Sequence, residues 1–260
     1  MKILSGFRLK AAVLLLVFTA VLSAPFCAFA RTINTAVLCY HGVTDNPLHY
    51  DTYRISAAEF ESDLQYFTSQ GYTFLLPREM WNASSGAKNI VLTFDDGYED
   101  FYTVVYPLLQ KYGVKAAVFI IGSEIDKTNY LKSWQIKELY NSGLVEIGNH
   151  TTIMHTYEYP LSVLKTNELI INEYIEDVKD CSARVAAITG RGTESFSYPN
   201  GRYTERLDRV IRDNLGYTTT FSTDYGLVYT QDDVLHPMDR IYRIHGDTPQ
   251  KIESMIESLK

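Results

Sequence analysis

The chain has 260 residues, of which 46% are hydrophobic and 21% are charged, which is enough for a domain with a sizeable core. Its formal net charge of −7 argues against nucleic acid as a partner, because nucleic-acid binding demands a basic face. Three cysteines are too few for a framework of disulfides in a chain of this length, and Cys39 fits the core of an apolar strand.

The first 30 residues have the features of an export signal. Three basic residues among the first ten precede an apolar stretch over 11–30, which ends on Ala28-Phe29-Ala30, a small-x-small cleavage pattern. We expect residues 1–30 to be a cleaved signal peptide and residues 31–260 to form one domain that is secreted or attached to the cell surface. An uncleaved segment would instead be a membrane anchor, since its length is close to that of a spanning helix.

Apolar runs and amphipathic stretches alternate along the rest of the chain, which predicts alternating strands and helices. Thr35–Tyr40 fits a buried strand, and the capping box Ser56-Ala57-Ala58-Glu59 begins a helix that stops at Gly71. The next predicted strand, Ile90–Phe94, runs directly into Asp95-Asp96-Gly97. The remaining predicted elements are a helix over Phe101–Tyr112, a strand over Ala116–Ile121, a helix capped by Ser133, a strand over Leu144–Ile147, a helix over Ser162–Asp180, a strand over Ser195–Tyr198, a helix capped by Thr204, a strand over Tyr217–Phe221, a strand over Ile241–Ile244 and a helix capped by Thr248.

Repeated strand–helix units indicate a parallel sheet, which is either open and doubly wound or closed as a barrel. No glycine-rich phosphate loop or dinucleotide fingerprint follows any predicted strand, and this weakens the open, nucleotide-binding option. We therefore expect an α/β fold of the TIM-like barrel type.

Polar residues follow three of the predicted strands. Asp95-Asp96 follows one strand, the segment His150–His155 follows another, and Pro199-Asn200-Gly201 follows a third. In a parallel barrel the carboxyl ends of all strands open on one face, where active sites are built. We therefore expect the three segments to converge on one cleft.

Each segment alone also has an ordinary explanation. Asp95-Asp96-Gly97 is a common turn sequence, and single histidines are more often surface or packing residues than ligands. Together, Asp96, His150 and His155 form a set that suits zinc, cobalt or another divalent ion, with an open position left for water. Such an ion polarises a carbonyl group and lowers the pKa of a bound water.

Three motifs resemble those of the polysaccharide deacetylase family (NodB homology domain, carbohydrate esterase family 4). They are Thr93-Phe94-Asp95-Asp96-Gly97, the segment from His150 to His155, and Phe196-Ser197-Tyr198-Pro199-Asn200-Gly201. The resemblance covers nearly all of the chain after residue 30 and is strongest to the exported branch that deacetylates poly-N-acetylglucosamine. It implies a distorted (β/α) barrel with fewer than eight regular units.

The resemblance also implies a metal-dependent hydrolase that removes acetyl groups, most simply the N-acetyl groups of N-acetylglucosamine units, from an acetylated polysaccharide or oligosaccharide. It assigns Asp95 as general base and Asp96, His150 and His155 as ligands of the metal. The segment Tyr198-Pro199-Asn200 and His41 would contact substrate, and a backbone N–H near Asn200 would stabilise the oxyanion.

Three departures from the family pattern leave parts of the site open. The two histidines are five residues apart, whereas many members space them by four. Ser197 stands near the place where many members carry an arginine that orients the base, and Arg243 is a candidate substitute. The late Leu-x-His motif that supplies the general acid is not evident, which leaves His245 and His41 as candidates.

Two other functions fit the same fold. A catalytically silent carbohydrate-binding protein would not need Asp95, and a hydrolase of small amides or cyclic imides would have a narrow, blocked cleft. We expect a monomer that acts on a carbohydrate polymer, has no nucleic-acid partner, and contacts a membrane only if residues 1–30 are retained.

Overall fold

The computed structural model of the protein describes residues 32–46, 51–83, 86–157, 159–226, 228–230 and 236–259. The expected signal peptide over 1–30 lies outside these ranges. None of the described helices combines the length and the apolar composition needed to cross a membrane.

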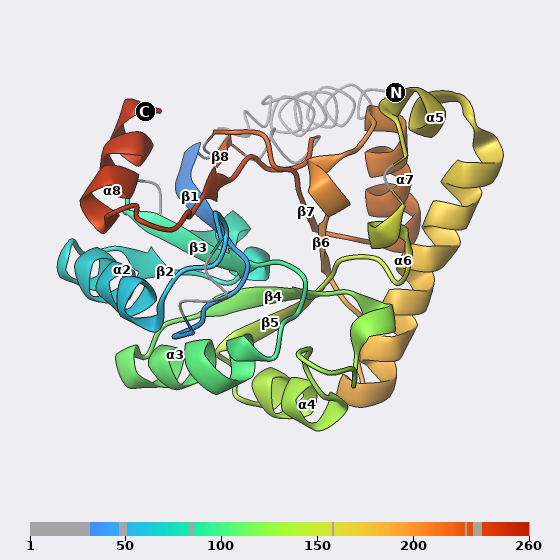
Figure 1. Ribbon diagram of the computed structural model, residues 1–260. Helices are drawn as coiled ribbons and strands as arrows, with labels where there is room; N and C mark the ends of the chain where they lie inside the picture. The colour runs from blue at the N-terminus through green and yellow to red at the C-terminus, as the bar shows by residue number, and fades with distance from the viewer. Residues whose placement is uncertain are drawn as a thin grey trace, which may run out of the picture. The chain divides into compact units, whose positions relative to one another are not determined.

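A sheet of nine strands forms the centre of the described structure (Figure 1). Its main path runs β7-β6-β5-β4-β3-β1-β8, in which β8 alone is antiparallel to its neighbour, while β2 pairs with β3 and β9 pairs with β1. Within the described ranges β7 and β8 do not pair with each other, so the sheet is an open half-barrel. The strands are β1 (Thr32–Tyr40), β2 (Thr73–Phe74), β3 (Asn89–Phe94), β4 (Ala116–Ile120), β5 (Val145–Asn149), β6 (Ser195–Ser197), β7 (Thr219–Phe221), β8 (Val228–Thr230) and β9 (Ile241–Tyr242).

Helices surround this sheet, as Figure 1 shows for α2, α3, α4, α6 and α7. Parallel neighbours in the sheet are joined by crossover connections that place helices against it, which is the pattern of a distorted TIM-like barrel. The α-helices are α2 (Ala57–Ser69), α3 (Tyr106–Tyr112), α4 (Ser133–Asn141), α5 (Leu161–Thr166), α6 (Glu168–Thr189), α7 (Glu205–Leu215) and α8 (Pro249–Ser258).

The strand β3 shows why the sheet is buried on both faces. All six of its residues are buried. Ile90, Leu92 and Phe94 pack in the large cluster that contains residues of α2 and α3, whereas Val91 packs in a smaller cluster with Phe119 and Phe221. Because side chains alternate across a strand, the first set lies beneath the helices and Val91 lies on the opposite face of the sheet. This largely apolar segment thus fixes the strand that leads into Asp95.

Most of the predicted elements are confirmed, including the capping box at Ser56 and the caps at Thr204 and Thr248. Several predictions are wrong in detail. β9 ends at Tyr242 instead of Ile244, α6 runs to Thr189 instead of Asp180, and the predicted helix over Phe101–Tyr112 begins as a π-helix over Phe101–Val105. Ser133 is the first residue of α4 and Lys132 is its N-cap. The single helix expected over Ser162–Asp180 is two helices, because Asn167 ends α5 and its side chain accepts hydrogen bonds from the first turn of α6.

Candidate active site

The carboxyl ends of β3, β5 and β6 bring the three predicted segments together. Asp95 and Asp96 follow β3, His150 follows β5, and Ser197 ends β6. Asp96 has a φ of 75°, in the left-handed region, and Gly97 follows with a φ of 74°. This sharp turn separates two adjacent carboxylates: Asp95 faces Arg240 and Ser197, and Asp96 faces the two histidines.

Asp96 lies beside both histidines. Its Oδ1 atom is 3.6 Å from His150 Nε2 and 3.2 Å from His155 Nε2. The two imidazole rings are themselves 4.9 Å apart between centroids. Burial alone would raise the pKa of Asp96, but the contact with His155 and the proximity of His150 lower it, so the carboxylate is ionised.

His150 presents its Nε2 atom to Asp96 because its other ring nitrogen is already engaged. The Nδ1 atom is 2.7 Å from the carbonyl oxygen of Ser197, and a carbonyl only accepts hydrogen bonds, so Nδ1 carries the proton. The side chain is almost fully buried, and burial lowers the pKa of His150. A neutral imidazole with a free Nε2 lone pair is the form that binds a metal.

The loop between the two histidines is fixed by Asp177 of α6, which sequence reasoning did not find. Its carboxylate accepts hydrogen bonds from the backbone N–H groups of Thr152 at 2.6 Å and Ile153 at 2.9 Å. Thr151 adopts a φ of 68°, and its N–H donates to the side chain of Asn149. These contacts turn the chain within five residues, which is how the longer spacing still brings His155 back beside His150.

Asp96, His150 and His155 fit a divalent metal ion. Their donor atoms all lie within 4.8 Å of one another. Ligands at about 2.0–2.2 Å from a tetrahedral zinc are separated by about 3.3–3.5 Å, and the two distances from Asp96 Oδ1 fall close to this value. Two imidazoles and one carboxylate are also donors that zinc accepts. The three residues therefore have both the chemistry and the spacing of a ligand set.

Asp95 is held by a buried arginine. Arg240 donates from Nη1 to Asp95 Oδ1 at 2.9 Å and from Nη2 to Oδ2 at 2.8 Å, and Ser197 Oγ donates to Oδ2 at 3.2 Å. Both charged side chains are buried. Burial raises the pKa of Asp95, but Arg240 and His150 outweigh it and hold that pKa well below its usual range. Asp95 is thus an oriented, ionised carboxylate beside the ligand set.

Cys39 and His41 lie on the β1 side of Asp95. Cys39 Sγ is 3.8 Å from Asp95 Oδ2, and one donor atom each of Cys39, His41 and Asp95 lie within 4.8 Å of one another. This second group is a poor metal site, because both Asp95 oxygens are bonded to a guanidinium and burial raises the pKa of the Cys39 thiol. The half-buried His41 lies beside Asp95, and its Nδ1 atom is buried without a hydrogen-bond partner among the described residues.

A model of the family described as polysaccharide deacetylase matches residues 82–220, which is more than half of the chain. The chain belongs to the polysaccharide deacetylase family. The matched region contains Asp95, Asp96, His150 and His155, whereas Arg240 lies beyond it.

Individual relatives of the chain agree with the family match. YxkH of Bacillus subtilis is 28% identical over 229 residues, covering 86% of this chain and 76% of that protein. The poly-beta-1,6-N-acetyl-D-glucosamine N-deacetylase of Staphylococcus aureus is 27% identical over 171 residues, covering 62% of this chain and 58% of that enzyme. The solved structure of IcaB from Ammonifex degensii is 25% identical, with a TM-score of 0.75, and covers 86% of this chain and 97% of that chain. A polysaccharide deacetylase from Bacillus cereus is 25% identical, with a TM-score of 0.72, and covers 86% of this chain and 69% of that chain. These similarities confirm the predicted fold.

Three other predicted site residues lie elsewhere. Arg243 pairs with Asp63 beneath α2, at 2.6 Å from Nε to Oδ2, so it does not orient Asp95. His245 is exposed and bonds to Glu59 at 3.0 Å, instead of facing the ligand set. Tyr198 is fully buried, because the strand directs its ring into the core, where its hydroxyl donates to Asp208.

The two residues that follow Tyr198 differ in their exposure to solvent. Pro199 is buried, and Asn200 is exposed at the rim with a φ of 53°. The N–H of Tyr198 donates to Phe221 O at 3.0 Å, so it is not an oxyanion donor. Of the segment Tyr198-Pro199-Asn200, only Asn200 is exposed to solvent.

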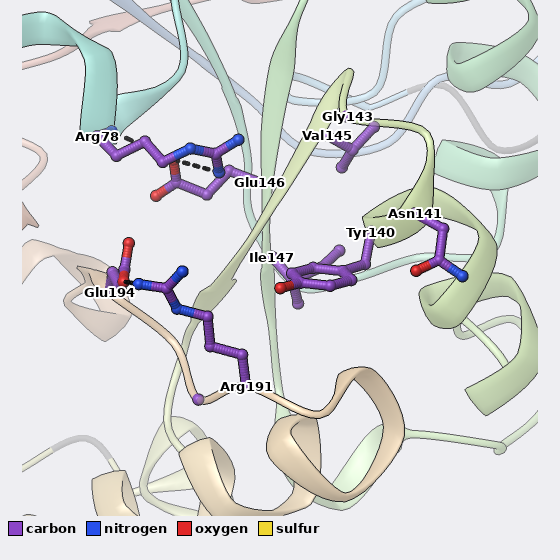
Figure 2. Close-up of a pocket in the computed structure, with 10 residues that line it drawn as sticks. Arg78, Tyr140, Asn141, Gly143, Val145, Glu146, Ile147, Arg191 and Glu194 are labelled. Atoms are coloured by element: carbon purple, nitrogen blue, oxygen red, sulfur yellow. Dashed lines mark hydrogen bonds and ion pairs between the residues drawn. The ribbon is translucent and has the colours of Figure 1, made fainter.

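A cavity of about 400 Å³ lies at the opposite, amino-terminal end of β5 (Figure 2). Figure 2 shows its four charged side chains as two ion pairs, Arg78 with Glu146 and Arg191 with Glu194. Each guanidinium is neutralised by a neighbouring carboxylate. In parallel barrels this end of the strands serves stability and the carboxyl end serves chemistry. We therefore place the candidate active site at Asp95 and Asp96.

Proposed function

We propose that this protein hydrolyses acetyl groups, most simply the N-acetyl groups of N-acetylglucosamine units, from an extracellular or cell-wall polysaccharide. The observation that carries the proposal is the position of an ionised Asp95, held by Arg240, beside the ligand set of Asp96, His150 and His155. A binding protein has no need for an oriented base next to a metal site. Residues 31–260 would be the catalytic domain.

A divalent ion, most simply zinc, held by Asp96, His150 and His155 would polarise the acetyl carbonyl group and lower the pKa of the attacking water. Asp95 accepts a proton from that water, and Arg240 keeps the carboxylate ionised and in place. The water oxygen bonds to the acetyl carbon, the carbon–nitrogen bond breaks, and acetate and the free amine leave.

The departing amine needs a proton, and His41 is the residue best placed to give it. His245 faces Glu59, whereas a ring nitrogen of His41 lies within 4.8 Å of an Asp95 oxygen. The two ring neighbours of His41, Tyr53 and Tyr242, lie at centroid distances of 5.2 and 6.1 Å and restrict its orientation. We assign His41 as the general acid of the proposed reaction.

The substrate proposal draws on the relatives and on the sequence. The Staphylococcus aureus relative acts on poly-beta-1,6-N-acetyl-D-glucosamine according to its name, although this chain spans only 58% of its length. The export signal that we expect over residues 1–30 supports an extracellular site of action. Deacetylation of such a polymer would expose amines and make the polymer cationic.

The deciding experiment measures acetate release from N-acetylglucosamine oligomers by the protein comprising residues 31–260. It is run after chelation and after zinc is added back, with Asp95→Asn and His150→Ala as controls. We expect zinc-dependent release that both variants lose. A protein that binds zinc but releases no acetate from these oligomers or from acetylated xylan would contradict the proposal and favour an imide substrate or a silent binding protein.

A further inference from the structure

The two histidines of the ligand set are held in different ways. His150 directly follows β5, its Nδ1 atom bonds to Ser197 O at 2.7 Å, and its side chain is 3% exposed. The His155 side chain is 29% exposed, and among the described residues its ring has a polar contact only with Asp96. The place of His155 therefore depends on the backbone that leads to it, residues 151–154, which we call the histidine loop.

One carboxylate, that of Asp177 in α6, accepts hydrogen bonds from three successive N–H groups of the histidine loop. They belong to Thr152 at 2.6 Å, Ile153 at 2.9 Å and Met154 at 3.4 Å. The Thr152 hydroxyl in turn donates to the backbone carbonyl of Asp177 at 3.0 Å. Asp177 is buried, and hydrogen bonds from backbone N–H groups to a carboxylate are stronger than those between neutral groups. Asp177 thus fixes the backbone up to the residue before His155.

The carbonyl groups of the histidine loop bond to a second segment, which follows β4. The N–H of Gly122 donates to Thr151 O at 2.9 Å, and the N–H of Ser123 donates to Thr152 O at 3.2 Å. A Cβ atom at Gly122 would lie 3.0 Å from Thr152 Oγ1 and 3.3 Å from Cys181 Cα, so the absence of a side chain lets this segment approach both the loop and α6 closely. The histidine loop is therefore bonded to two separate parts of the fold.

The same turn of α6 also contacts both ends of the histidine loop. Asn149, the last residue of β5, donates from Nδ2 to Val178 O at 2.8 Å. Met154 is buried in the cluster that contains Tyr174 and Val178. Residues 174–178 of α6 therefore contact the chain from the end of β5 to Met154.

All of these contacts join groups of the chain to one another, and none uses a donor atom of the ligand set. Backbone that must be ordered when a ligand binds loses conformational entropy, and this loss weakens binding. A loop that is already fixed avoids the loss, because its histidine is in place when the ion arrives.

We propose that Asp177 is a positioning residue, which holds His155 beside Asp96 before a metal ion binds and thereby sets the affinity of the ligand set for the ion. The inference rests on the ligand set of the proposed function and adds to it a residue outside the ligands that controls their affinity. It also gives the two histidines unequal roles. His150 keeps its place without Asp177, because β5 and Ser197 hold it, whereas His155 does not.

The first test compares zinc dissociation constants, measured by competition with a chromophoric chelator. Asp177→Asn keeps the shape of the side chain but replaces one oxygen by an amide nitrogen, which cannot accept from the loop N–H groups. We expect the zinc Kd to rise at least about tenfold, as is typical when a residue that supports a metal ligand is lost.

Asp180→Asn is the matched control for this substitution. Asp180 lies on the same helix, is exposed and bonds to Arg184, so the zinc Kd of the variant should stay within about twofold of wild type. A folded Asp177→Asn protein with the wild-type Kd would overturn the inference.

Two further readouts distinguish positioning from a role in stability or in chemistry. A residue that only stabilised the fold would lower the free energy of unfolding of the metal-free protein, measured in urea, and leave the zinc Kd of the folded protein unchanged. In the proposed reaction, saturating zinc should restore the kcat of Asp177→Asn to within about threefold of wild type, because the substitution weakens metal binding alone. A kcat that stays at least about tenfold low at saturating zinc would contradict a role through metal affinity. If wild type released no acetate, the proposed function would fail, and the comparison of Kd values would still decide this inference.

Hydrogen exchange tests the inference without a substitution, and so also covers the case in which Asp177→Asn does not fold. The Ile153 side chain is exposed, so protection of its N–H reports the bond to Asp177. In metal-free wild type we expect the N–H groups of Thr152 and Ile153 to exchange at least about 100-fold more slowly than in an unstructured peptide. Exchange at the rate of an unstructured peptide would show that the histidine loop is not held before the ion binds, and would overturn the inference.

Discussion

Arg240 donates to both carboxylate oxygens of Asp95 across a sequence separation of 145 residues, and both side chains are buried. Two guanidinium N–H groups bond to the two carboxylate oxygens. The contact therefore fixes the orientation of the Asp95 carboxylate and favours its ionised form. A proposed base that is buried beside a metal site needs such a partner to stay ionised. The electrostatics of the site thus depend on a residue outside every motif in the sequence.

Replacing Arg240 by methionine should raise the pKa of Asp95, because burial then acts without the guanidinium that opposes it. The base must be ionised to accept a proton, so the acid limb of the kcat/KM profile should move to higher pH, with a loss of about 100-fold at neutral pH. The profile from pH 4 to 9 is the measurement.

Arg243→Met is the matched control for this substitution, because it removes a second buried guanidinium that faces Asp63 instead. It should lower the free energy of unfolding by about 3–5 kcal/mol, as expected when one partner of a buried ion pair is lost. The acid limb of the Arg243→Met profile should stay in place. If the acid limb of the kcat/KM profile lay at the same pH in wild type and in Arg240→Met, Arg240 would not set the charge of Asp95.

Zinc should stabilise the folded protein through Asp96, His150 and His155. A ligand at 100 times its dissociation constant adds about 2.7 kcal/mol, which for a domain of this size raises the Tm by about 5–10 °C. Differential scanning fluorimetry with and without zinc should show this rise in wild type and in Asp95→Asn. The rise should vanish in His150→Ala, whose remaining donors are one carboxylate and one imidazole. A rise that persists undiminished in His150→Ala would place the metal elsewhere.

His41→Gln should separate amide from ester substrates. The amine that leaves an N-acetyl group must be protonated, whereas the 4-nitrophenolate that leaves 4-nitrophenyl acetate needs no proton. Loss of a general acid typically costs about 10²–10⁴-fold, so we expect a loss of that size on N-acetylglucosamine oligomers and less than about threefold on the ester. Equal losses on both substrates would assign His41 to binding or structure.

Asp100 should make the protein less stable as the pH rises. Its Oδ1 atom is buried without a hydrogen-bond partner, and burial raises its pKa to about 7, against the opposing effects of the Val43 N–H and Arg54. The carboxyl group has a pKa of about 3.9 when unfolded, so it takes up a proton on folding. Its contribution to the free energy of unfolding is therefore fully present below about pH 4 and is lost as the pH approaches 7.

Asp100→Asn should remove this loss and be more stable than wild type at pH 8 by about 1–3 kcal/mol, as measured by urea unfolding at pH 5 and pH 8. Asp126→Asn is a control for which we expect the opposite change in stability at pH 8. Hydrogen bonds from the Ser133 hydroxyl and N–H lower the pKa of Asp126, so its ionised form favours the folded state, and the asparagine variant should be less stable at pH 8. A destabilised Asp100→Asn at pH 8 would contradict the argument.

The ligand set of Asp96, His150 and His155 could be predicted from the sequence, because it depends on local sequence patterns. The buried strand over Asn89–Phe94 is rich in apolar residues and runs directly into two carboxylates, and the carboxyl ends of parallel strands share one edge. His150 and His155 follow the predicted strand over Leu144–Ile147. Their unusual spacing did not prevent convergence, because Asp177 holds the loop between them.

The role of Arg240 could not be predicted from the sequence in the same way. It precedes β9 by one residue, outside any apolar run, and its partner is in a distant segment. Arg243, three residues later, has the same residue type and an equally plausible position in the sequence. Only the tertiary structure shows that one guanidinium points to Asp95 and the other to Asp63. The sequence pattern also did not predict the break between α5 and α6, because the helical spacing of apolar residues continues across Asn167.

The left-handed turn at Asp96 limits which residues the protein can carry there. Backbone of this kind costs most residues about 1–2 kcal/mol, while glycine, asparagine and aspartate adopt it most readily. Only aspartate among these three brings a full negative charge to a metal. Replacement of Asp96 by asparagine or glycine would therefore weaken or abolish metal binding at this position, while the turn and the barrel would stay intact. In evolutionary terms, one substitution at this position would separate the proposed hydrolase from an inert protein of the same fold.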